Sequence, residues 1–337
     1  MGSIRLAVAG TDGSDAKLFL EKLEDREDLE ITSLFPLETA PEEYDALRFR
    51  KKNWLKEKIE DFDFSQTDVA VFYSAPSRSR DAILSALEAG CAVIDATGGP
   101  VPQGGILMIP AAGGSPADTR GRLFVSPPPP VISSVLALGP VIRRFGLERA
   151  EITAMESASA SGYGAVMELA GQTAGLLNGR SVTHRHFPVQ SAFNVIPSVI
   201  GASHDGEDRQ YSDHELAVIA GLESFLPELA GKTSCSCFTV PMFHGYCAHI
   251  SFTPAVPVSL EELRAALEEE PSLEYVAAET VSPVTHGTDR ERQVITRLRS
   301  SAGCSGEFNM FAVMDSTMAG MVLNSLGILE WISRELF

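Results

Sequence analysis

The stretch IRLAVAGTDGSDAKLFLEKLED, residues 4–25, decides the fold class of this chain. Its opening residues are mostly apolar and predict a buried β-strand. Small and polar residues follow as a tight turn, and from Ser14 apolar side chains recur as in an amphipathic helix, at Ala16, Leu18, Leu20 and Leu23. A strand, a turn and a helix in this order begin a parallel βαβ unit.

The same alternation continues through the first third of the chain. Strands are predicted at residues 29–37 (LEITSLFPL), 67–75 (TDVAVFYSA) and 91–97 (CAVIDAT), and a helix at residues 77–90 (SRSRDAILSALEAG) ends at a glycine. Repeated strand and helix units with right-handed crossovers form a parallel sheet with helices on both faces. The fold class predicted for this region is therefore α/β, a Rossmann-type doubly wound sheet.

Beyond about residue 130 the pattern changes to longer alternating strands, such as SCFTVPMF (236–243) and YCAHISFTPAV (246–256). Helices are predicted near residues 163–178, 213–227 and 259–269, which gives an α+β domain. The last segment, STMAGMVLNSLGILEWISREL (316–336), is a long amphipathic helix that we expect to return to the first domain. The predicted domains are residues 1–129, 130–314 and the C-terminal helix 315–337.

The composition of the chain disfavours several classes of function. The formal net charge of −18 disfavours binding to nucleic acid and to anionic membrane surfaces. No segment reaches the length of uncharged apolar residues that a membrane span needs, and no secretory signal is visible at the N-terminus. Five cysteines, an odd number in a long chain, favour a reducing compartment. We expect a cytoplasmic protein that binds neither nucleic acid nor membrane.

The turn AGTDGSDA has the small residues of a phosphate-binding loop. Gly10, Gly13 and Ala16 stand at GxxGxxA spacing, which lets backbone N–H groups and a helix N-terminus approach a pyrophosphate. Asp12 and Asp15, however, bring negative charge to the place where phosphate would lie. The turn is interpreted either as a dinucleotide site or as a tight strand-to-helix turn that binds nothing, since a lone glycine pattern is often a false positive.

The chain resembles a known family in five segments. These are the opening βαβ unit and residues 68–98, 155–179, 193–201 and 315–330. In their order and spacing the chain resembles the aspartate-semialdehyde dehydrogenase family over nearly its whole length. The resemblance implies a Rossmann domain for NADP, an α+β domain that forms a homodimer, and a C-terminal helix on the first domain. NADP or NAD is then an expected ligand, and the candidate cofactor-binding residues are Gly10, Thr11, Gly13, Ser74 and Asn324.

The family's catalytic positions carry different residues in this chain. The nucleophilic cysteine of the family pattern Asn-Pro-Asn-Cys falls on Pro129, and the glutamine that orients the thioester falls on Glu156. The arginine that binds the substrate carboxylate falls on Thr239, and the general acid-base histidine falls on Tyr246. Proline offers no nucleophile, threonine makes no bidentate carboxylate contact, and a phenol is a poor base near neutral pH.

Four coordinated changes predict a protein that keeps the fold without the reaction, and in this the chain resembles the non-catalytic Usg proteins. The interpretation is a homodimer with residual NAD(P) binding. One alternative is an active NADP-dependent oxidoreductase for an aldehyde with relocated groups, in which His244 activates Cys247 or Ser126. Another is a structural partner that forms heterodimers with an active paralogue.

A metal site is also weighed, because five potential ligands lie within 15 residues: Cys235, Cys237, His244, Cys247 and His249. The first two cysteines share one face of a predicted strand, and Cys247 shares a face of the neighbouring strand with His249. Since the spacing lacks the CxxC pairs of ordinary zinc ligands, no metal site is predicted. The other histidines, at 184, 186, 204 and 214, are expected at strand edges and in loops.

Overall fold

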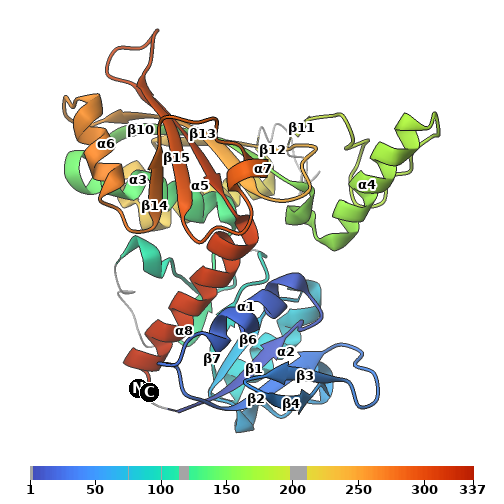
Figure 1. The fold of residues 1–337 in the computed structure, drawn as a ribbon. Helices are drawn as coiled ribbons and strands as arrows, with labels where there is room; N and C mark the ends of the chain where they lie inside the picture. The colour runs from blue at the N-terminus through green and yellow to red at the C-terminus, as the bar shows by residue number, and fades with distance from the viewer. Residues whose placement is uncertain (1–2, 75, 100, 114–120, 198–210) are drawn as a thin grey trace. The chain divides into compact units, whose positions relative to one another are not determined.

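The computed structural model describes residues 3–74, 76–99, 101–113, 121–197 and 211–337 (Figure 1). The chain forms two compact units. Unit 1 contains Met1–Pro128 and Met321–Phe337, and unit 2 contains Pro129–Gly320. The C-terminal segment therefore belongs to the same unit as the N-terminal βαβ region, as the sequence predicts.

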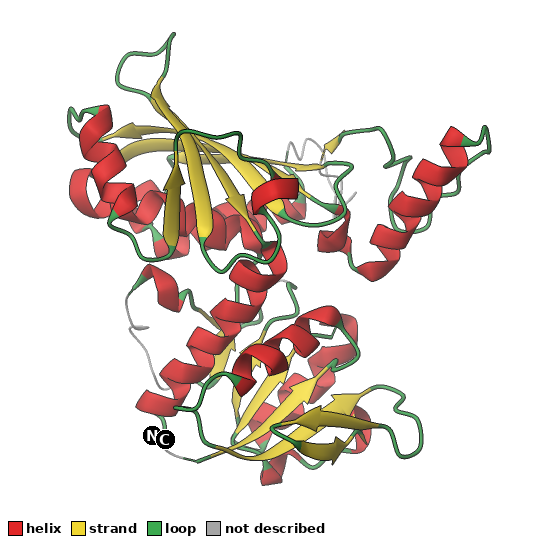
Figure 2. Cartoon of the chain, viewed as in Figure 1, coloured by secondary structure: helices red, strands yellow, loops and turns green. Residues whose placement is uncertain are grey.

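Unit 1 is built on a seven-stranded sheet in which every paired strand is parallel (Figure 2). In spatial order its strands are β5 (Glu57–Lys58), β2 (Ile31–Glu38), β1 (Ile4–Ala9), β6 (Val69–Phe72), β7 (Ala92–Asp95), β9 (Leu123–Val125) and β8 (Ile106–Leu107). The charged segment that precedes β5 adds a small antiparallel pair, β3 (Ala46–Phe49) and β4 (Lys52–Leu55).

Helices cover both faces of this sheet. One hydrophobic core joins the strands to α1 (Ser14–Glu24) and to α8 (Leu323–Glu335), and includes Phe19, Val71 and Ile332. A second core on the other face joins α2 (Pro76–Glu88) to alternate residues of the same strands. The doubly wound arrangement follows from this alternation, because successive side chains of a strand point to opposite faces.

Unit 2 contains a mixed seven-stranded sheet. Its spatial order is β11 (Ile196–Pro197), β12 (Thr233–Thr239), β10 (Leu147–Glu156), β13 (Tyr246–Pro254), β16 (Phe308–Met314), β15 (Gln293–Ser300) and β14 (Leu273–Val276). Three helices pack against the strands: α3 (Pro129–Phe145), α5 (Asp213–Phe225) and α6 (Leu260–Glu268). Two more are α4 (Tyr163–Leu177), which extends away from the sheet in Figure 1, and the short α7 (Pro283–His286).

The fold class expected from the sequence is thus confirmed: a parallel Rossmann-like sheet, a second domain with a mixed sheet, and a C-terminal helix that packs on the first. The proline run of residues 127–130 connects β9 to α3, whose first residue is Pro129. Proline is well tolerated there because the first N–H groups of a helix have no intrahelical partner. Among the residues described, no helix has the length and apolar character that crossing a bilayer requires.

Candidate functional site

The turn after β1 has the tight geometry that its glycines predict. Gly10 has φ +86°, and a Cβ atom built there would lie 2.8 Å from Ser74 Oγ and 2.9 Å from Ser74 N. Gly13 N donates a hydrogen bond to Gly10 O at 2.9 Å and stands at the N-cap of α1. The structure therefore brings three of the candidate cofactor residues together, and Gly10 is required by both its backbone angle and the close approach of Ser74.

An acidic side chain lies against this turn from the end of β2. Glu38 Oε1 accepts hydrogen bonds from Asp12 N at 2.6 Å and from the hydroxyl of the buried Thr11 at 3.2 Å. Lys56 bridges Asp12 and Asp45, with N–O distances of 2.7 and 2.6 Å. A carboxylate at the end of the second strand is typical of folds that bind the ribose 2′-hydroxyl of NAD.

Asn324, the remaining candidate cofactor residue, is used inside unit 1. Its side-chain Nδ2 donates to Met108 O at 2.9 Å and to Ser126 Oγ at 2.8 Å, and both Asn324 and Ser126 are buried. The amide fixes α8 to the segments around β8 and β9. Ser126, considered above as a relocated nucleophile, is held in this buried contact.

The ends of three central strands in unit 2 meet at one level of the sheet. Glu156, the last residue of β10, pairs with Thr239 of β12 on one side and with Tyr246 of β13 on the other. Directly paired residues of neighbouring strands point their side chains to the same face. These three residues, which we call the rung, were selected in sequence from three separate segments, and the structure brings them side by side.

Tyr246 is enclosed within this rung. Only 1% of its surface is exposed, and its hydroxyl oxygen contacts no hydrogen-bond partner among the described residues. Burial, reinforced by neighbouring thiols and Glu156, holds the pKa of the Tyr246 phenol well above its usual value. The group therefore stays protonated and has no access to solvent for general acid-base work.

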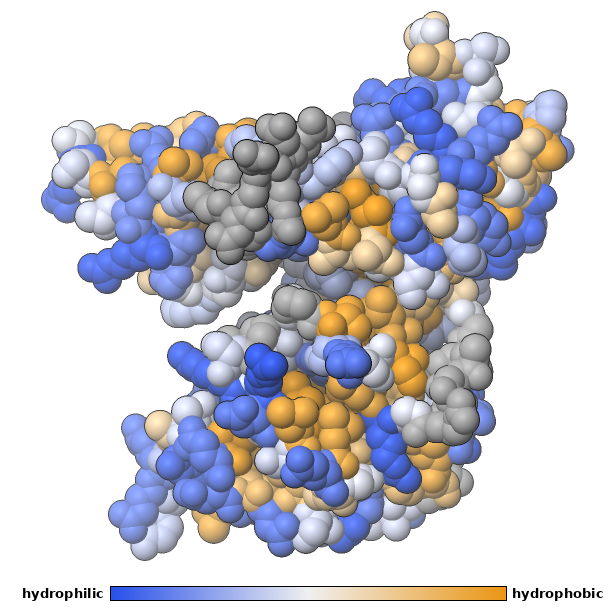
Figure 3. Space-filling view, turned by 180° about the vertical axis from the view of Figure 1, so that it is seen from behind, coloured by the Kyte–Doolittle hydropathy of each residue, from blue (hydrophilic) through white to orange (hydrophobic). Residues whose placement is uncertain are grey.

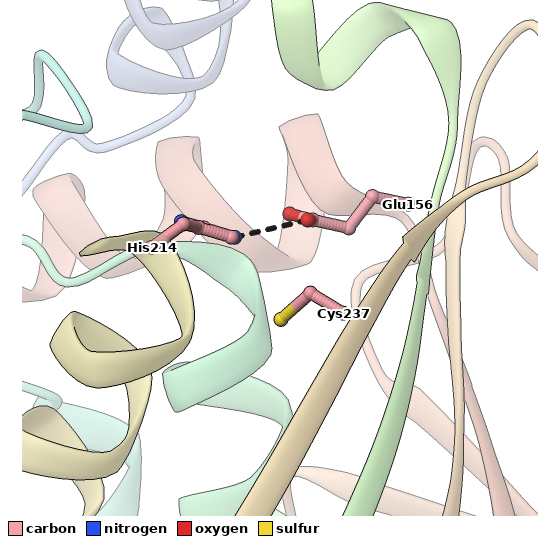
Figure 4. Close-up of side chains that lie close together, drawn as sticks. All are labelled: Glu156, His214 and Cys237. Atoms are coloured by element: carbon pink, nitrogen blue, oxygen red, sulfur yellow. Dashed lines mark hydrogen bonds and ion pairs between the residues drawn. The ribbon is translucent and has the colours of Figure 1, made fainter. Parts of the chain in front are cut away.

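Glu156 also belongs to a cluster of three side chains from three elements (Figure 4). Its Oε2 lies 2.9 Å from Nε2 of His214 on the first turn of α5, and Cys237 Sγ of β12 completes a group whose ligand atoms all lie within 4.8 Å of one another. Burial alone would lower the pKa of His214, but hydrogen bonding to Cys237 and Glu156 raises it to about 10. The histidine is then a cation paired with Glu156 near neutral pH.

Cys237 is a neutral thiol in this environment. Its pKa is raised above the usual value by the neighbouring Cys235, whose Sγ lies 3.8 Å away, and by burial. Its backbone is fixed by Glu215, whose Oε1 accepts from Cys237 N at 3.0 Å while Oε2 accepts from Ser212 N at the N-cap of α5. The cluster is thus held in place by a carboxylate that caps α5 and contacts β12.

Comparison with known proteins identifies the family to which this fold belongs. The profile described as "Semialdehyde dehydrogenase, dimerisation domain" matches residues 138–319, more than half of the chain. The chain belongs to the semialdehyde dehydrogenase family. Aspartate-semialdehyde dehydrogenase 2 of Vibrio cholerae is 27% identical over 340 residues, which cover 98% of each chain. The USG-1 protein homolog of Pseudomonas aeruginosa is 26% identical and covers 96% of each.

Solved structures of the family agree with these sequence matches. The structure of Vibrio cholerae aspartate semialdehyde dehydrogenase II complexed with ASA superposes with a TM-score of 0.89 at 26% identity, covering all of both chains. A probable aspartate-semialdehyde dehydrogenase from Pseudomonas aeruginosa has a TM-score of 0.90 at 25% identity, again over both whole chains. The resemblance inferred from the sequence is therefore confirmed for the fold and the family, which includes USG-1 homologues.

Within the semialdehyde dehydrogenase fold, the predicted strand neighbourhood is wrong. β12 does not neighbour β13, because β10 lies between them. Through the pairing register, Cys235 and Cys237 share the face of Ile152 and Ala154, whereas Cys247 and His249 lie on the opposite face. The five potential metal ligands of residues 235–249 therefore form no common site, and His244 is exposed.

His214 was expected at a strand edge or in a loop, and this is also wrong. It lies on the first turn of α5 and contacts Glu156. Sequence reasoning missed the pair because 58 residues separate them. The helix predicted near residues 213–227 already includes His214, and the capping-box pattern Ser212-x-x-Glu215 marks the start of that helix. His184 and His186 lie in a loop as expected, and residue 204 lies outside the described residues.

Proposed function

We propose that this member of the semialdehyde dehydrogenase family is a non-catalytic homodimer that retains a dinucleotide site in unit 1. The observation that carries the proposal is the rung. Glu156, Thr239 and Tyr246 stand where the family pattern has glutamine, arginine and histidine, and they meet at one level of the sheet. Their adjacency supports the assignment of these three positions, because residues chosen at random from three segments would not be expected to pair directly in one sheet.

The chemistry of the rung supports the loss of the reaction. A thiohemiacetal intermediate carries developing negative charge on oxygen, and Glu156 would oppose it. The buried phenol of Tyr246 cannot exchange protons with a substrate, and Pro129 supplies no sulfur at the start of α3. Each change removes a different part of the mechanism, so restoring one position alone would not restore turnover.

Relocated cysteines offer weak nucleophiles. Burial raises the pKa of the Cys247 thiol to about 12, and Cys237 is likewise shifted upward. Cys91 is buried, with Sγ 3.2 Å from the carbonyl oxygens of Phe64 and Thr67, and burial raises its pKa as well. Thiolate is the reactive form, so these three thiols are poorly suited to attack an aldehyde.

The homodimer is supported by the dimerisation-domain match and by the surface of α4. This helix extends from the sheet and exposes Tyr163, Met167 and Leu177, and hydrophobic residues stand among hydrophilic ones on the arm it forms in Figure 3. Large exposed apolar side chains grouped on one helix are typical of a surface that a partner covers. We expect light scattering to give twice the mass of 36.2 kDa. A monomer would contradict this part, and co-purification of an active relative would favour heterodimers.

The decisive experiment is an assay of aspartate semialdehyde oxidation with NADP and phosphate, beside an active relative such as the Vibrio cholerae enzyme. We expect no turnover above background. Turnover that depends on phosphate and disappears in Glu156→Gln or Tyr246→Phe would overturn the proposal.

The second candidate function is an oxidoreductase with relocated groups, and the Glu156–His214–Cys237 cluster is the observation that favours it. This candidate requires an activity that Cys237→Ser abolishes and Cys247→Ser preserves. Alkylation of all cysteines provides an independent check, since an activity that survives it excludes a cysteine-based mechanism.

A further inference from the structure

Three chemically different donor atoms meet in unit 2. Glu156 at the end of β10 contributes a carboxylate oxygen, His214 on α5 an imidazole nitrogen and Cys237 on β12 a sulfur. In a tetrahedral zinc site, bonds of about 2.0–2.3 Å separate neighbouring ligand atoms by roughly 3.3–3.8 Å. Because the three atoms already lie within 4.8 Å of one another, small side-chain rotations would bring all of them to one ion.

We propose that Glu156, His214 and Cys237 form a binding site for one zinc ion, with a fourth position open to water. The proposal is independent of whether the protein is catalytic. A thiolate beside an imidazole favours zinc over magnesium or calcium, which prefer oxygen ligands alone. Zinc is d¹⁰ and accepts such a mixed set without a strict geometric demand.

The site is preorganised by the residues around it. Glu215 accepts from Cys237 N and caps the helix turn that carries His214, so one carboxylate fixes two of the three ligand-bearing segments. Glu156 is fixed by sheet pairing on both sides. Ligands held by such supporting contacts lose little freedom when an ion binds.

Access and charge also suit a divalent ion. The side chains of Glu156 and His214 are 11% and 24% exposed, so an ion would enter past the histidine. Cys237 lies deeper, with 1% of its surface exposed. One carboxylate and one thiolate balance the two charges of zinc, and the protons of the thiol and of imidazole Nε2 pass to solvent. The metal-free cluster is a histidine–carboxylate pair beside a thiol, and zinc must compete with that pair.

The sheet provides a matched control. Cys247 and His249 are a cysteine and a histidine on β13, which is two strands away from β12, and they lie on the face opposite to Cys237. The full chain, with any affinity tag removed, is treated with a chelator and titrated with zinc against a chromophoric competitor. We expect one ion per chain, and weakening of about 100-fold or more in Cys237→Ser and His214→Asn, since each removes a ligand. Cys247→Ser and His249→Asn should bind as the unmodified chain does.

Cobalt substitution tests the proposal by spectroscopy of the unmodified protein and of the control variant. A thiolate-to-cobalt charge-transfer band and intense tetrahedral ligand-field bands are expected in the unmodified protein, and both should persist in Cys247→Ser. If Cys237→Ser fails to fold, Glu156→Gln serves in its place, because it keeps a hydrogen-bonding side chain and should weaken zinc about tenfold or more. Less than about a tenth of an ion per chain, no thiolate band, or equal weakening in both variant sets would overturn the proposal.

Discussion

The βα turn of unit 1 follows the end of the central strand β1, and the rung of unit 2 lies at the end of the central strand β10. At the turn, the residue that backbone geometry demands is present: Gly10 has a positive φ and lies against Ser74. At the rung, backbone pairing is regular through Glu156, and its side chains are the ones that we propose differ from the family pattern. The turn carries a residue that its backbone geometry requires, whereas the strand pairing at the rung requires no particular side chain.

This difference separates two kinds of constraint. A glycine with positive φ and no space for Cβ stabilises the fold of unit 1, whatever the turn binds. Side chains at a strand end contribute little to the sheet itself, so their chemistry can change while the ladder persists. The loss of catalysis that we propose would therefore change side chains at the rung while the strand pairing persists.

The largest effect is expected from Gly10→Ala. The alanine would have to adopt a positive φ, and its methyl group would lie 2.9 Å from the backbone nitrogen of Ser74. We expect the free energy of unfolding to fall by about 3 kcal/mol. Gly90→Ala is the control, because Gly90 has φ +88° with open space around it, and should lose only about 1 kcal/mol. Both tryptophans, Trp54 and Trp331, belong to unit 1, so fluorescence during urea unfolding reports on it. Equal losses in the two variants would show that crowding is unimportant.

A smaller loss of stability is expected when the contacts between α5 and β12, beside the rung, are removed. Glu215→Ala removes the α5 capping box together with the acceptor for Cys237 N, and we expect a loss of about 2 kcal/mol. Glu262→Ala, at the exposed first turn of α6, removes a capping box alone and should lose less. Hydrogen exchange of the β12 amides measures the change, with tryptophan fluorescence of unit 1 as an internal reference. If the two variants behave alike, the contact to Cys237 adds nothing.

Much of the fold could be predicted from local patterns. The strand at residues 4–9, its turn and the helix that follows are predicted from an apolar run, glycines and helical periodicity, all of which are local. Glu156, Thr239 and Tyr246 could be proposed as family positions, but their adjacency could not be predicted, since it depends on strand order. Predicting β12 and β13 as neighbours was wrong because β10, from a distant segment, lies between them.

The Glu156–His214–Cys237 cluster was beyond sequence reasoning for the same reason. Its members come from a strand end, a helix start and a second strand, and only the mixed sheet order brings them together. The nearby cysteines and histidines of residues 235–249 suggested a different set, since closeness in sequence ignores the alternation of side chains between the two faces. The long-range pairing of strands, rather than residue type, determines which side chains come together in the cluster.

The turn of unit 1 should distinguish NAD from NADP. Glu38 occupies the end of β2 and contacts Asp12 N, so a 2′-phosphate would meet a carboxylate, whereas a 2′-hydroxyl could donate to it. We expect NAD to bind about tenfold more tightly than NADP, close to 1.4 kcal/mol, and Glu38→Gln to reduce the difference. Calorimetric titration of both nucleotides measures it. A preference for NADP in the unmodified protein would mean that the turn still serves the family's cofactor.

The smallest effect, and the sharpest test of the rung, is Tyr246→Phe. The hydroxyl is buried without a hydrogen-bond partner among the described residues, so the folded state carries its desolvation penalty without compensation. Removing it should raise the free energy of unfolding by about 1 kcal/mol, measured by hydrogen exchange in β13. Tyr163→Phe, at a residue 78% exposed, should change little. A destabilisation by Tyr246→Phe would reveal a partner for the hydroxyl and a polar role for the position that we assign to the family's histidine.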